Sequence, residues 1–242
     1  MNVSLSGKKI LVTGATGAIG RAVAERLLEC GAWVAGSYLG NEEAAAELGR
    51  QGVSMARADL TRREEARGLV RKVLEQAGRL DGLVYTAGNT RDRTLLKMTD
   101  GEWDDVLRLH LDGLMACCRE ALPAMREQGA GKLVAVGSIS GAIGRAGQAN
   151  YSAAKAAVVG FMKSVAREAG RFGVAANVVL PGFVESRMTR AAPPEAWERA
   201  RQDSAMGTVS DAQVAASFTA WLMSDLCLGV TGQVFNLDSR IY

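Results

Sequence analysis

The stretch Thr13-Gly14-Ala15-Thr16-Gly17-Ala18-Ile19-Gly20 decides the fold, because it joins a short apolar run to a longer amphipathic segment. The run 10–13 is typical of a strand, and the segment 19–30 has the spacing of a helix. Glycines at such a junction allow a tight turn, the close approach of a phosphate and close packing of helix on sheet. The free N–H groups at the helix start favour an anionic diphosphate.

Outward from this turn, the same alternation continues along the chain. The pattern predicts strands at 10–13, 33–38, 53–58, 83–86, 133–137, 174–180 and 234–237, and helices at 19–30, 42–50, 62–77, 100–126, 151–171 and 211–223. Continuously apolar strands need cover on both faces, so the chain is α/β: a doubly wound parallel sheet with right-handed crossovers. The one long irregular stretch, about 183–207, is expected to be a substrate lid within a single domain 1–242, with an ordinary surface excursion as the alternative.

The composition excludes several classes of protein. The chain has 242 residues, 48% of them hydrophobic, and a net charge of +3 without a long run of basic residues, so no nucleic-acid partner is expected. With a single histidine and no C-x-x-C among four cysteines, no metal site is expected, and scattered cysteines fit a reducing compartment. The apolar segment after the N-terminus is too short for a signal sequence or a membrane span, so a cytoplasmic location without a membrane partner is predicted.

Three side chains form a candidate catalytic group. Tyr151 and Lys155 are four residues apart, so a helix would place the phenol and the ammonium on one face. A nearby cation lowers the pKa of a phenol and makes it a usable acid or base. Ser138 follows the fifth predicted strand, at the edge where open α/β sheets hold their ligands, and Ser140, two residues further on, is an alternative to it. Taken separately, each could equally be a solvated pair or a turn serine.

These motifs, together with Asn-Val-Val-Leu-Pro-Gly at 177–182, resemble the short-chain dehydrogenase/reductase family, and within it the 3-oxoacyl-[acyl-carrier-protein] reductases. The most specific stretches are 88–105, 147–151 and 181–189. The resemblance implies a single-domain Rossmann fold with a seven-stranded parallel sheet in the order 3-2-1-4-5-6-7. It also implies NADPH-dependent reduction of a 3-oxoacyl thioester in fatty-acid or polyketide-type synthesis, with acyl carrier protein or acyl-CoA as partner, in a homotetramer.

The resemblance assigns roles to single residues. Ser138 would position the carbonyl, Tyr151 would donate the proton, and Lys155 would tune Tyr151 and hold the nicotinamide ribose. Further cofactor contacts are expected from Gly14, Ala15, Thr16, Gly17, Ile19, Gly20, Ser37, Asp59, Leu60, Thr86, Ala87, Gly88, Pro181, Gly182, Val184 and Ser186.

The chain departs from the family pattern near these residues. The usual Asn-Asn-Ala-Gly is Tyr85-Thr86-Ala87-Gly88, and the usual fourth catalytic residue, an asparagine, aligns with His110. An imidazole titrates near pH 6.5 and could hold a relay water behind Lys155, which predicts an ionisation of the enzyme between about pH 6 and 7.5. The alternative is that His110 only packs.

Cofactor and substrate are predicted less directly. The end of the second strand, 36–41, has small side chains and no acidic residue before Glu42, and this leaves room for the 2′-phosphate of NADP. Against NADP, this strand end has no arginine, and the glycine turn has no arginine before Arg21. NADP is therefore favoured over NAD. The substrate could instead be a CoA-linked or free small carbonyl or alcohol. A non-catalytic, cofactor-binding subunit of a hetero-oligomer is the alternative outside the enzymes.

Overall fold

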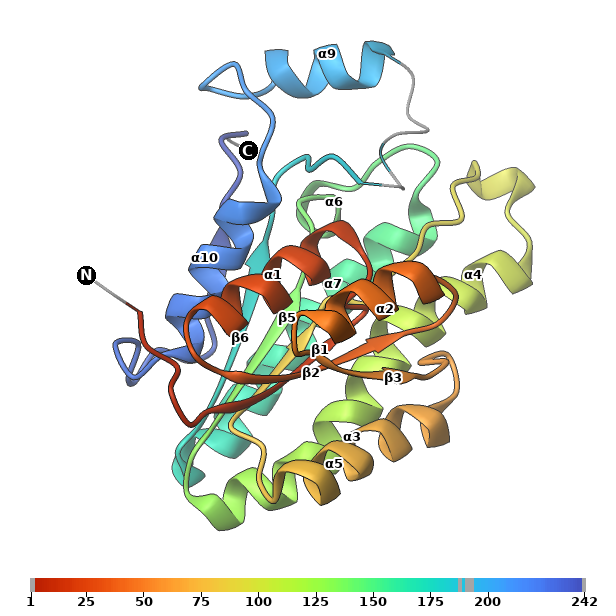
Figure 1. Ribbon diagram of the computed structural model, residues 1–242. Helices are drawn as coiled ribbons and strands as arrows, with labels where there is room; N and C mark the ends of the chain where they lie inside the picture. The colour runs from red at the N-terminus through yellow and green to blue at the C-terminus, as the bar shows by residue number, and fades with distance from the viewer. Residues whose placement is uncertain (1–2, 187–188, 190–193, 241–242) are drawn as a thin grey trace.

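The computed structural model describes residues 3–186, 189 and 194–240 (Figure 1). Seven parallel strands form one sheet in the order β3-β2-β1-β4-β5-β6-β7, which confirms the predicted fold and strand order. The strands are β1 (Lys9–Thr13), β2 (Trp33–Tyr38), β3 (Ser54–Arg57), β4 (Gly82–Tyr85), β5 (Gly131–Val136), β6 (Val174–Leu180) and β7 (Val234–Asn236).

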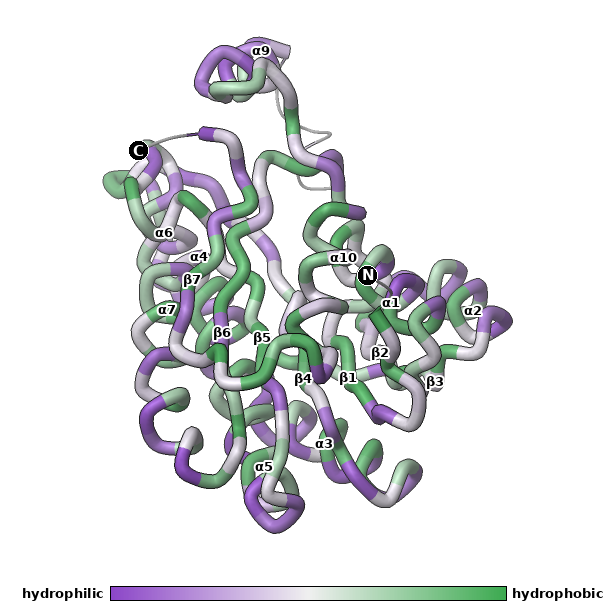
Figure 2. Tube along the Cα trace, turned by 90° about the vertical axis from the view of Figure 1, so that its left-hand side faces the viewer, coloured by the Kyte–Doolittle hydropathy of each residue, from purple (hydrophilic) through white to green (hydrophobic). Residues whose placement is uncertain are grey.

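Helices cover both faces of the sheet, as continuously apolar strands require. One layer consists of α1 (Ala18–Glu29), α2 (Glu42–Arg50) and α10 (Ala212–Met223), and the other of α3 (Arg63–Ala77), α5 (Gly113–Gln128) and α7 (Ala149–Ala169). Each layer encloses its own hydrophobic cluster, and Figure 2 shows the strands as apolar tubes between the helices. The helix α7, which carries Tyr151 and Lys155, is therefore packed against the sheet through buried side chains.

The segment 100–126, expected as one helix, consists of three parts. These are α4 (Asp100–Leu107), the π-helical turn η2 (Arg108–Asp112) and α5. Shorter helices that the sequence pattern did not predict are η1 (Leu95–Lys97) and α6 (Ser140–Ile143), and the predicted helix 151–171 ends in the short helix η3 (Gly170–Phe172). The apolar spacing alone does not show a π turn, because it changes the helical phase by only one residue.

The described part of the segment that is expected to be a lid lies beyond the carboxyl ends of the strands. It contains α9 (Pro194–Gln202), which lies above the rest of the molecule in Figure 1. Val184 forms a β-bridge with Ser210, and Ser204 forms one with Arg240, so both ends of the segment are fastened to the domain. Of the apolar side chains in the expected lid, Phe183 packs edge-on against Trp197 at a centroid distance of 4.8 Å, and Met188 lies outside the described residues. No helix in the described ranges is long and apolar enough to span a bilayer.

Candidate active site

The glycine turn brings the start of α1 against the end of β4. Gly14 has φ +64°, and a Cβ there would lie 2.8 Å from the Cα of Ala87, so only glycine fits this crossing. Gly17 caps α1 without a side-chain hydrogen bond, and the first turn of the helix holds no acidic residue. The first amides of α1 are thus left for an anion, and the glycine-lined cradle fits a dinucleotide diphosphate.

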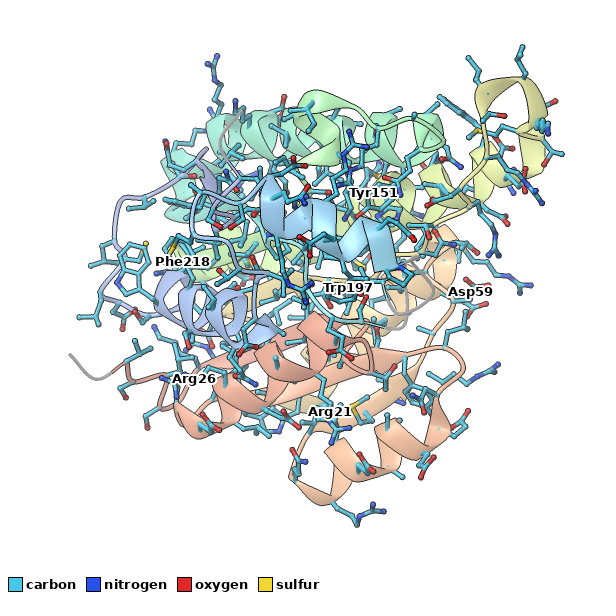
Figure 3. All side chains as sticks on the ribbon, turned by 90° about the horizontal axis from the view of Figure 1, so that it is seen from above. Arg21, Arg26, Asp59, Tyr151, Trp197 and Phe218 are labelled. Atoms are coloured by element: carbon cyan, nitrogen blue, oxygen red, sulfur yellow. The ribbon has the colours of Figure 1, made fainter. Side chains whose placement is uncertain are left out.

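Ser138, Tyr151 and Lys155 meet at the same edge of the sheet. Ser138 follows β5, and its Oγ accepts a hydrogen bond from the amide of Ser140 at 3.2 Å. Tyr151 and Lys155 share a face of α7, with the Lys155 Nζ 5.7 Å from the centroid of the tyrosine ring. Lys155 is 5% exposed and donates to the carbonyl of Val136 at 2.6 Å. Figure 3 looks down on this edge, with Tyr151 labelled beside α9.

The surroundings set the protonation of these groups. Burial raises the pKa of the Tyr151 phenol, and its interactions with the Ser138 hydroxyl and with the charge of Arg145 oppose that rise only in part. The phenol is therefore protonated at neutral pH, as a proton donor must be. Burial lowers the pKa of Lys155 from 10.5 to about 7, so its ammonium is poised to exchange a proton near neutrality.

His110 lies in the π turn and faces this group. Its ring stands edge-on to Tyr151, 5.3 Å away between centroids, and its Nε2 lies 2.8 Å from the carbonyl oxygen of Asn89. Burial, and next the charge of Lys155, lower the pKa of His110 to about 3. The expected ionisation of His110 between pH 6 and 7.5 is thereby corrected, since the imidazole stays neutral in that range. The Nδ1 atom is buried without a hydrogen-bond partner among the described residues.

Tyr85, the departure next to this site, is accommodated by two features. Its hydroxyl donates to the carbonyl of Leu109, in the π turn, at 2.6 Å. A Cβ on Gly113 would overlap that hydroxyl, so glycine makes room for the phenol ring. Burial raises the pKa of Tyr85 well above its usual value, and the side chain is a neutral strut between β4 and η2.

The loop after β4 is attached to the start of α7. Arg93 donates its amide to the carbonyl of Gly147 at 2.8 Å, and the Asn150 side chain donates to the carbonyl of Arg91 at 3.0 Å. Gln148 donates to the carboxylate of Asp92 at 2.8 Å. These contacts fix the loop beside Tyr151.

The other expected cofactor residues lie along the same edge. The Thr86 hydroxyl donates to the carbonyl of Thr13, Gly88 lies under the His110 ring, and the Ser186 amide donates to Thr189 at 2.7 Å. Those that follow β1, β3, β4 or β6 are Ala15, Thr16, Ile19, Gly20, Asp59, Leu60, Ala87, Pro181, Gly182 and Val184. The Ser37 hydroxyl is 1% exposed and accepts from the Gly14 amide at 3.1 Å, so it positions the glycine turn.

Arg57 is a candidate cofactor residue that the sequence analysis missed. Tyr38 pairs with Arg57 across β2 and β3, and the Arg57 Nε donates to the carbonyl of Leu39 at 3.0 Å. This corrects the expectation that no arginine stands at the end of β2. The signal in the sequence was an arginine near the carboxyl end of the third predicted strand, 53–58, which the expected strand order places beside the second strand. The other arginine considered, Arg21, is bound to Glu25 and Glu47.

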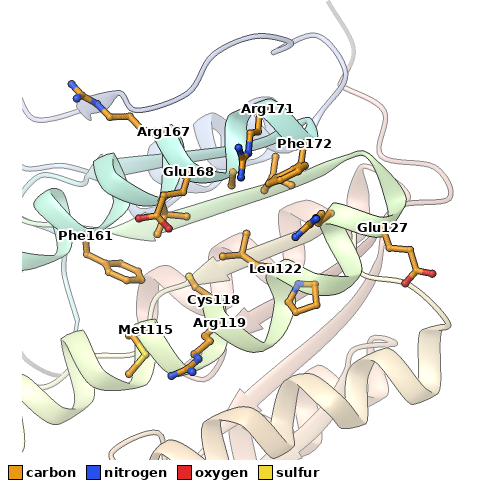
Figure 4. A pocket seen from close by; sticks show the side chains of 15 residues that line it. Met115, Cys118, Arg119, Leu122, Glu127, Phe161, Arg167, Glu168, Arg171 and Phe172 are labelled. Carbon is orange, nitrogen blue, oxygen red and sulfur yellow. The ribbon is translucent and has the colours of Figure 1, made fainter.

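A large groove, of about 1030 Å³, lies away from this site, between α5 and α7 (Figure 4). Phe161, Phe172 and Leu122 line it together with arginine and glutamate side chains. None of the residues assigned to catalysis or cofactor binding lines it. Among the described residues, no group of His, Cys, Asp and Glu could hold a metal ion.

Comparisons with known proteins identify the family and the fold that this chain resembles. The sequence model of the family described as short chain dehydrogenase matches residues 8–197. The chain is 37% identical over 243 residues to the 3-oxoacyl-[acyl-carrier-protein] reductase FabG of Vibrio harveyi, covering 99% of each chain. It is 38% identical over 241 residues to that of Staphylococcus aureus, covering 97% of this chain and 98% of the relative. The crystal structure of gox2181 superposes with a TM-score of 0.92 at 33% identity, covering 98% of this chain and 96% of that one.

Proposed function

Because this chain belongs to the short-chain dehydrogenase/reductase family, and is thus an oxidoreductase, we propose that it reduces a 3-oxoacyl thioester to the 3-hydroxyacyl thioester with NADPH. The observation that carries the proposal is the meeting of Tyr151, Lys155 and Ser138 at the sheet edge, beside the open start of α1. The relatives at 37–38% identity support the thioester as substrate.

The chain's own groups prepare the carbonyl for reduction. When bound, the nicotinamide supplies a hydride to the carbonyl carbon. The Ser138 hydroxyl orients the carbonyl oxygen, and the protonated Tyr151 phenol donates a proton to it as negative charge develops there. Lys155, held by the Val136 carbonyl, lies behind the phenol and favours its phenolate form after the transfer. The start of α1 and Gly14 hold the diphosphate.

His110 acts in this proposal as a neutral residue. Its Nε2 is occupied by the backbone of Asn89, and its unpartnered Nδ1 lies in the buried region that it shares with Lys155. A neutral imidazole nitrogen can bind one water, which would be the relay water expected behind Lys155. Because its pKa is about 3, His110 would hold that water without itself supplying the proton.

NADPH is proposed over NADH because of Arg57. Its guanidinium, tied to the carbonyl of Leu39, lies at the end of β2, where a Rossmann fold places the adenosine ribose. A planar cation there fits a 2′-phosphate. Glu42 opposes this choice in part, since its carboxylate lies 3.8 Å from the Arg57 Nε and accepts from the hydroxyl of Tyr38.

We also propose that the chain assembles into a homotetramer, with a second copy seated in the groove between α5 and α7. The groove combines aromatic side chains with both arginine and glutamate, a mixture that can pair with itself across a two-fold axis. Static light scattering should give a multiple of the 25.6 kDa chain mass, and a monomer peak would contradict the assembly. The four free cysteines support a reducing, cytoplasmic compartment.

The test is a substrate panel followed spectrophotometrically with NADPH and NADH. Carrier-protein, CoA and simple ketone substrates separate a carrier-protein reductase from a ketoreductase of free substrates. Tyr151→Phe should lower kcat at least about 100-fold and leave NADPH binding within about threefold, because only the proton donor is lost. Substantial turnover by this variant would refute the assignment. An inactive wild-type chain that binds NADPH would point to a cofactor-binding subunit instead.

A further inference from the structure

The π turn next to the site deprives one backbone carbonyl of its usual helical donor. In an α-helix the carbonyl of Leu109 would accept from the amide of Gly113, four residues further on. Here the Gly113 amide donates instead to the carbonyl of Arg108, five residues back, which is the hydrogen bond of a π turn. Away from solvent, a carbonyl without a donor is costly, so the Leu109 carbonyl needs a donor from outside the helix.

Tyr85, at the end of β4, supplies that donor. Its hydroxyl donates to the Leu109 carbonyl at 2.6 Å, and the residue is 3% exposed, within the hydrophobic cluster that α5 covers. Burial raises the pKa of the phenol well above its usual value, so the hydroxyl keeps its proton and donates at neutral pH. An ion pair of the same turn, between Asp112 and Arg63 at 3.1 Å, is partly exposed and therefore weak. Tyr85 is thus the buried anchor of the π turn.

Gly113 is fitted to the same phenol. A Cβ on this residue would overlap the Tyr85 hydroxyl and would lie 2.5 Å from the carbonyl oxygen of Leu60. A side chain at this position would therefore push the hydroxyl away from the Leu109 carbonyl. The residue whose amide forms the π hydrogen bond is also the residue that leaves room for the outside donor.

The anchored carbonyl sets the direction of the His110 side chain. The Leu109 carbonyl and the His110 amide belong to one planar peptide unit, so fixing the carbonyl fixes the backbone that leads into His110. On its other side the ring meets the loop after β4. A Cβ on Gly88 would lie 2.6 Å from the ring Cε1, and Nε2 lies 2.8 Å from the carbonyl oxygen of Asn89. Because a carbonyl oxygen only accepts, the proton is on Nε2, and Nδ1 is the unprotonated nitrogen.

The orientation of the ring decides where this acceptor nitrogen lies. Nδ1 is buried and has no hydrogen-bond partner among the described residues. The ring stands edge-on to that of Tyr151, 5.3 Å away between centroids, and the Lys155 Nζ lies 5.7 Å from the centroid of the same phenol. A rotation of the peptide between Leu109 and His110 would carry Nδ1 away from the place where it can hold a water for these two groups.

We propose that Tyr85 is a positioning residue of the reaction, which acts through His110: its hydroxyl holds the π turn in the phase that presents Nδ1 to the relay water. The inference rests on the proposed function and adds to it a residue that touches neither substrate nor cofactor. The chain departs from the usual family asparagine at both positions, 85 and 110. The bond from Tyr85 to the Leu109 carbonyl makes these two departures one arrangement.

The test uses the fact that His110 is the only histidine of the chain. In untagged protein labelled with ¹⁵N-histidine, the NMR signals of the ring therefore report on this residue alone. They show which nitrogen carries the proton and how fast that proton exchanges with water, without substrate or nucleotide. Tyr85→Phe removes only the hydroxyl. Lys132→Met is the matched control, because it withdraws a side-chain donor from the carbonyls of Ser224 and Cys227, far from the site at the amino-terminal end of β5.

We expect the wild type to show one tautomer with a slowly exchanging Nε2 proton. In Tyr85→Phe that proton should exchange at least about tenfold faster, whereas Lys132→Met should keep the wild-type rate although its midpoint of urea unfolding also falls. A wild-type rate in Tyr85→Phe would overturn the proposal. If Tyr85→Phe does not fold, 3-fluorotyrosine is placed at position 85 alone. It keeps the ring and donates more strongly, so the exchange should slow at least about twofold, and an unchanged rate would overturn the proposal.

Steady-state kinetics then test the link to the reaction. Tyr85→Phe should lower kcat about 5- to 20-fold and change KM for NADPH less than about twofold, because a displaced relay costs rate and not cofactor binding. In a His110→Ala background, which has no ring to position, the same substitution should change kcat less than about twofold. An equal loss in both backgrounds would overturn the action through His110. If the wild type reduces no substrate, the proposed function fails, and the exchange rates alone decide whether Tyr85 positions His110.

Discussion

Replacing Lys155 by methionine should stabilise the protein while removing its activity. Lys155 is buried, and its pKa falls from 10.5 to about 7 on folding, so above pH 7 the native state carries fewer protons than the unfolded chain. At neutral pH, folding must therefore either remove the proton of Lys155 or bury its charged ammonium. Because the unfolded chain binds more protons, the free energy of unfolding rises with pH between about 7 and 10.5. The depression corresponds to roughly 5 kcal/mol at and below pH 7, at about 1.4 kcal/mol per pH unit.

Methionine has a similar length and no charge, so Lys155→Met escapes this cost. It also leaves the Val136 carbonyl without its donor, which costs about 1–3 kcal/mol at every pH. The variant should thus exceed the wild type by about 2–4 kcal/mol at pH 7, and the difference should shrink by about 1 kcal/mol or more per pH unit up to pH 9. His110, with a pKa of about 3, is neutral in both native proteins over this range, and the fraction of a proton that it gains on unfolding near pH 7 is the same for both, so it cancels from their difference.

The measurement is urea unfolding followed by circular dichroism at pH 7, 8 and 9, without nucleotide and at one protein concentration. Buried thiols such as Cys117, whose pKa is raised to about 12, lower the stability of both proteins alike at the alkaline end, so the difference between the two curves isolates Lys155. A difference that stays constant from pH 7 to 9 would refute the reasoning, because Lys155 would then titrate near its ordinary pKa in the folded chain.

Three further substitutions test other parts of the site. Arg57→Gln should raise KM for NADPH about tenfold and that for NADH less than twofold in steady-state kinetics, whereas equal changes would remove Arg57 from the 2′-phosphate site. His110→Asn should keep kcat within about threefold and leave the pH–rate profile between pH 6 and 7.5 unchanged; a wild-type ionisation lost in the variant would show that the imidazole titrates there. Gly14→Ala should lower the free energy of unfolding by more than about 1 kcal/mol in urea titrations, because of its positive φ and the contact with Ala87; an unchanged midpoint would contradict this.

The sequence predicts those parts of the fold and site that depend on local spacing. The alternation of apolar runs predicts the doubly wound sheet, and the spacing of Tyr151 and Lys155 places both on one face of a helix. Arg57 was not predicted, because the pairing of β3 with β2 brings it to the proposed cofactor edge beside Leu39, although the two residues are eighteen positions apart in the chain. Local pattern carries no information about such pairing.

Protonation is predicted least well, because it depends on burial by several segments. An isolated imidazole titrates near pH 6.5, but His110 is enclosed by the backbone at Gly88 and Asn89, by Tyr151 and by the charge of Lys155. The Tyr151 phenol was expected to have a lowered pKa beside Lys155, yet burial raises its pKa, and the lowering effects of the Ser138 hydroxyl and of the Arg145 charge are smaller. Which groups surround a titratable side chain, and hence the direction of its pKa shift, is known only from the three-dimensional structure.

The π turn between α4 and α5 is an irregularity in a helix that the hydrophobic core does not require. The buried positions Val106, His110, Leu114, Cys117, Ala121 and Met125 follow one stripe, although the interval from first to last is one residue longer than five regular turns. Deleting one residue from 108–112 would preserve that stripe in an ordinary α-helix, so the core has no need of the extra residue. Such a helix would no longer present the Leu109 carbonyl to Tyr85 and the His110 ring to Asn89 at the same time. A single-residue deletion here would therefore yield a protein that still folds but whose proposed catalytic residues are misaligned. Stability and activity thus depend on different features of this helix.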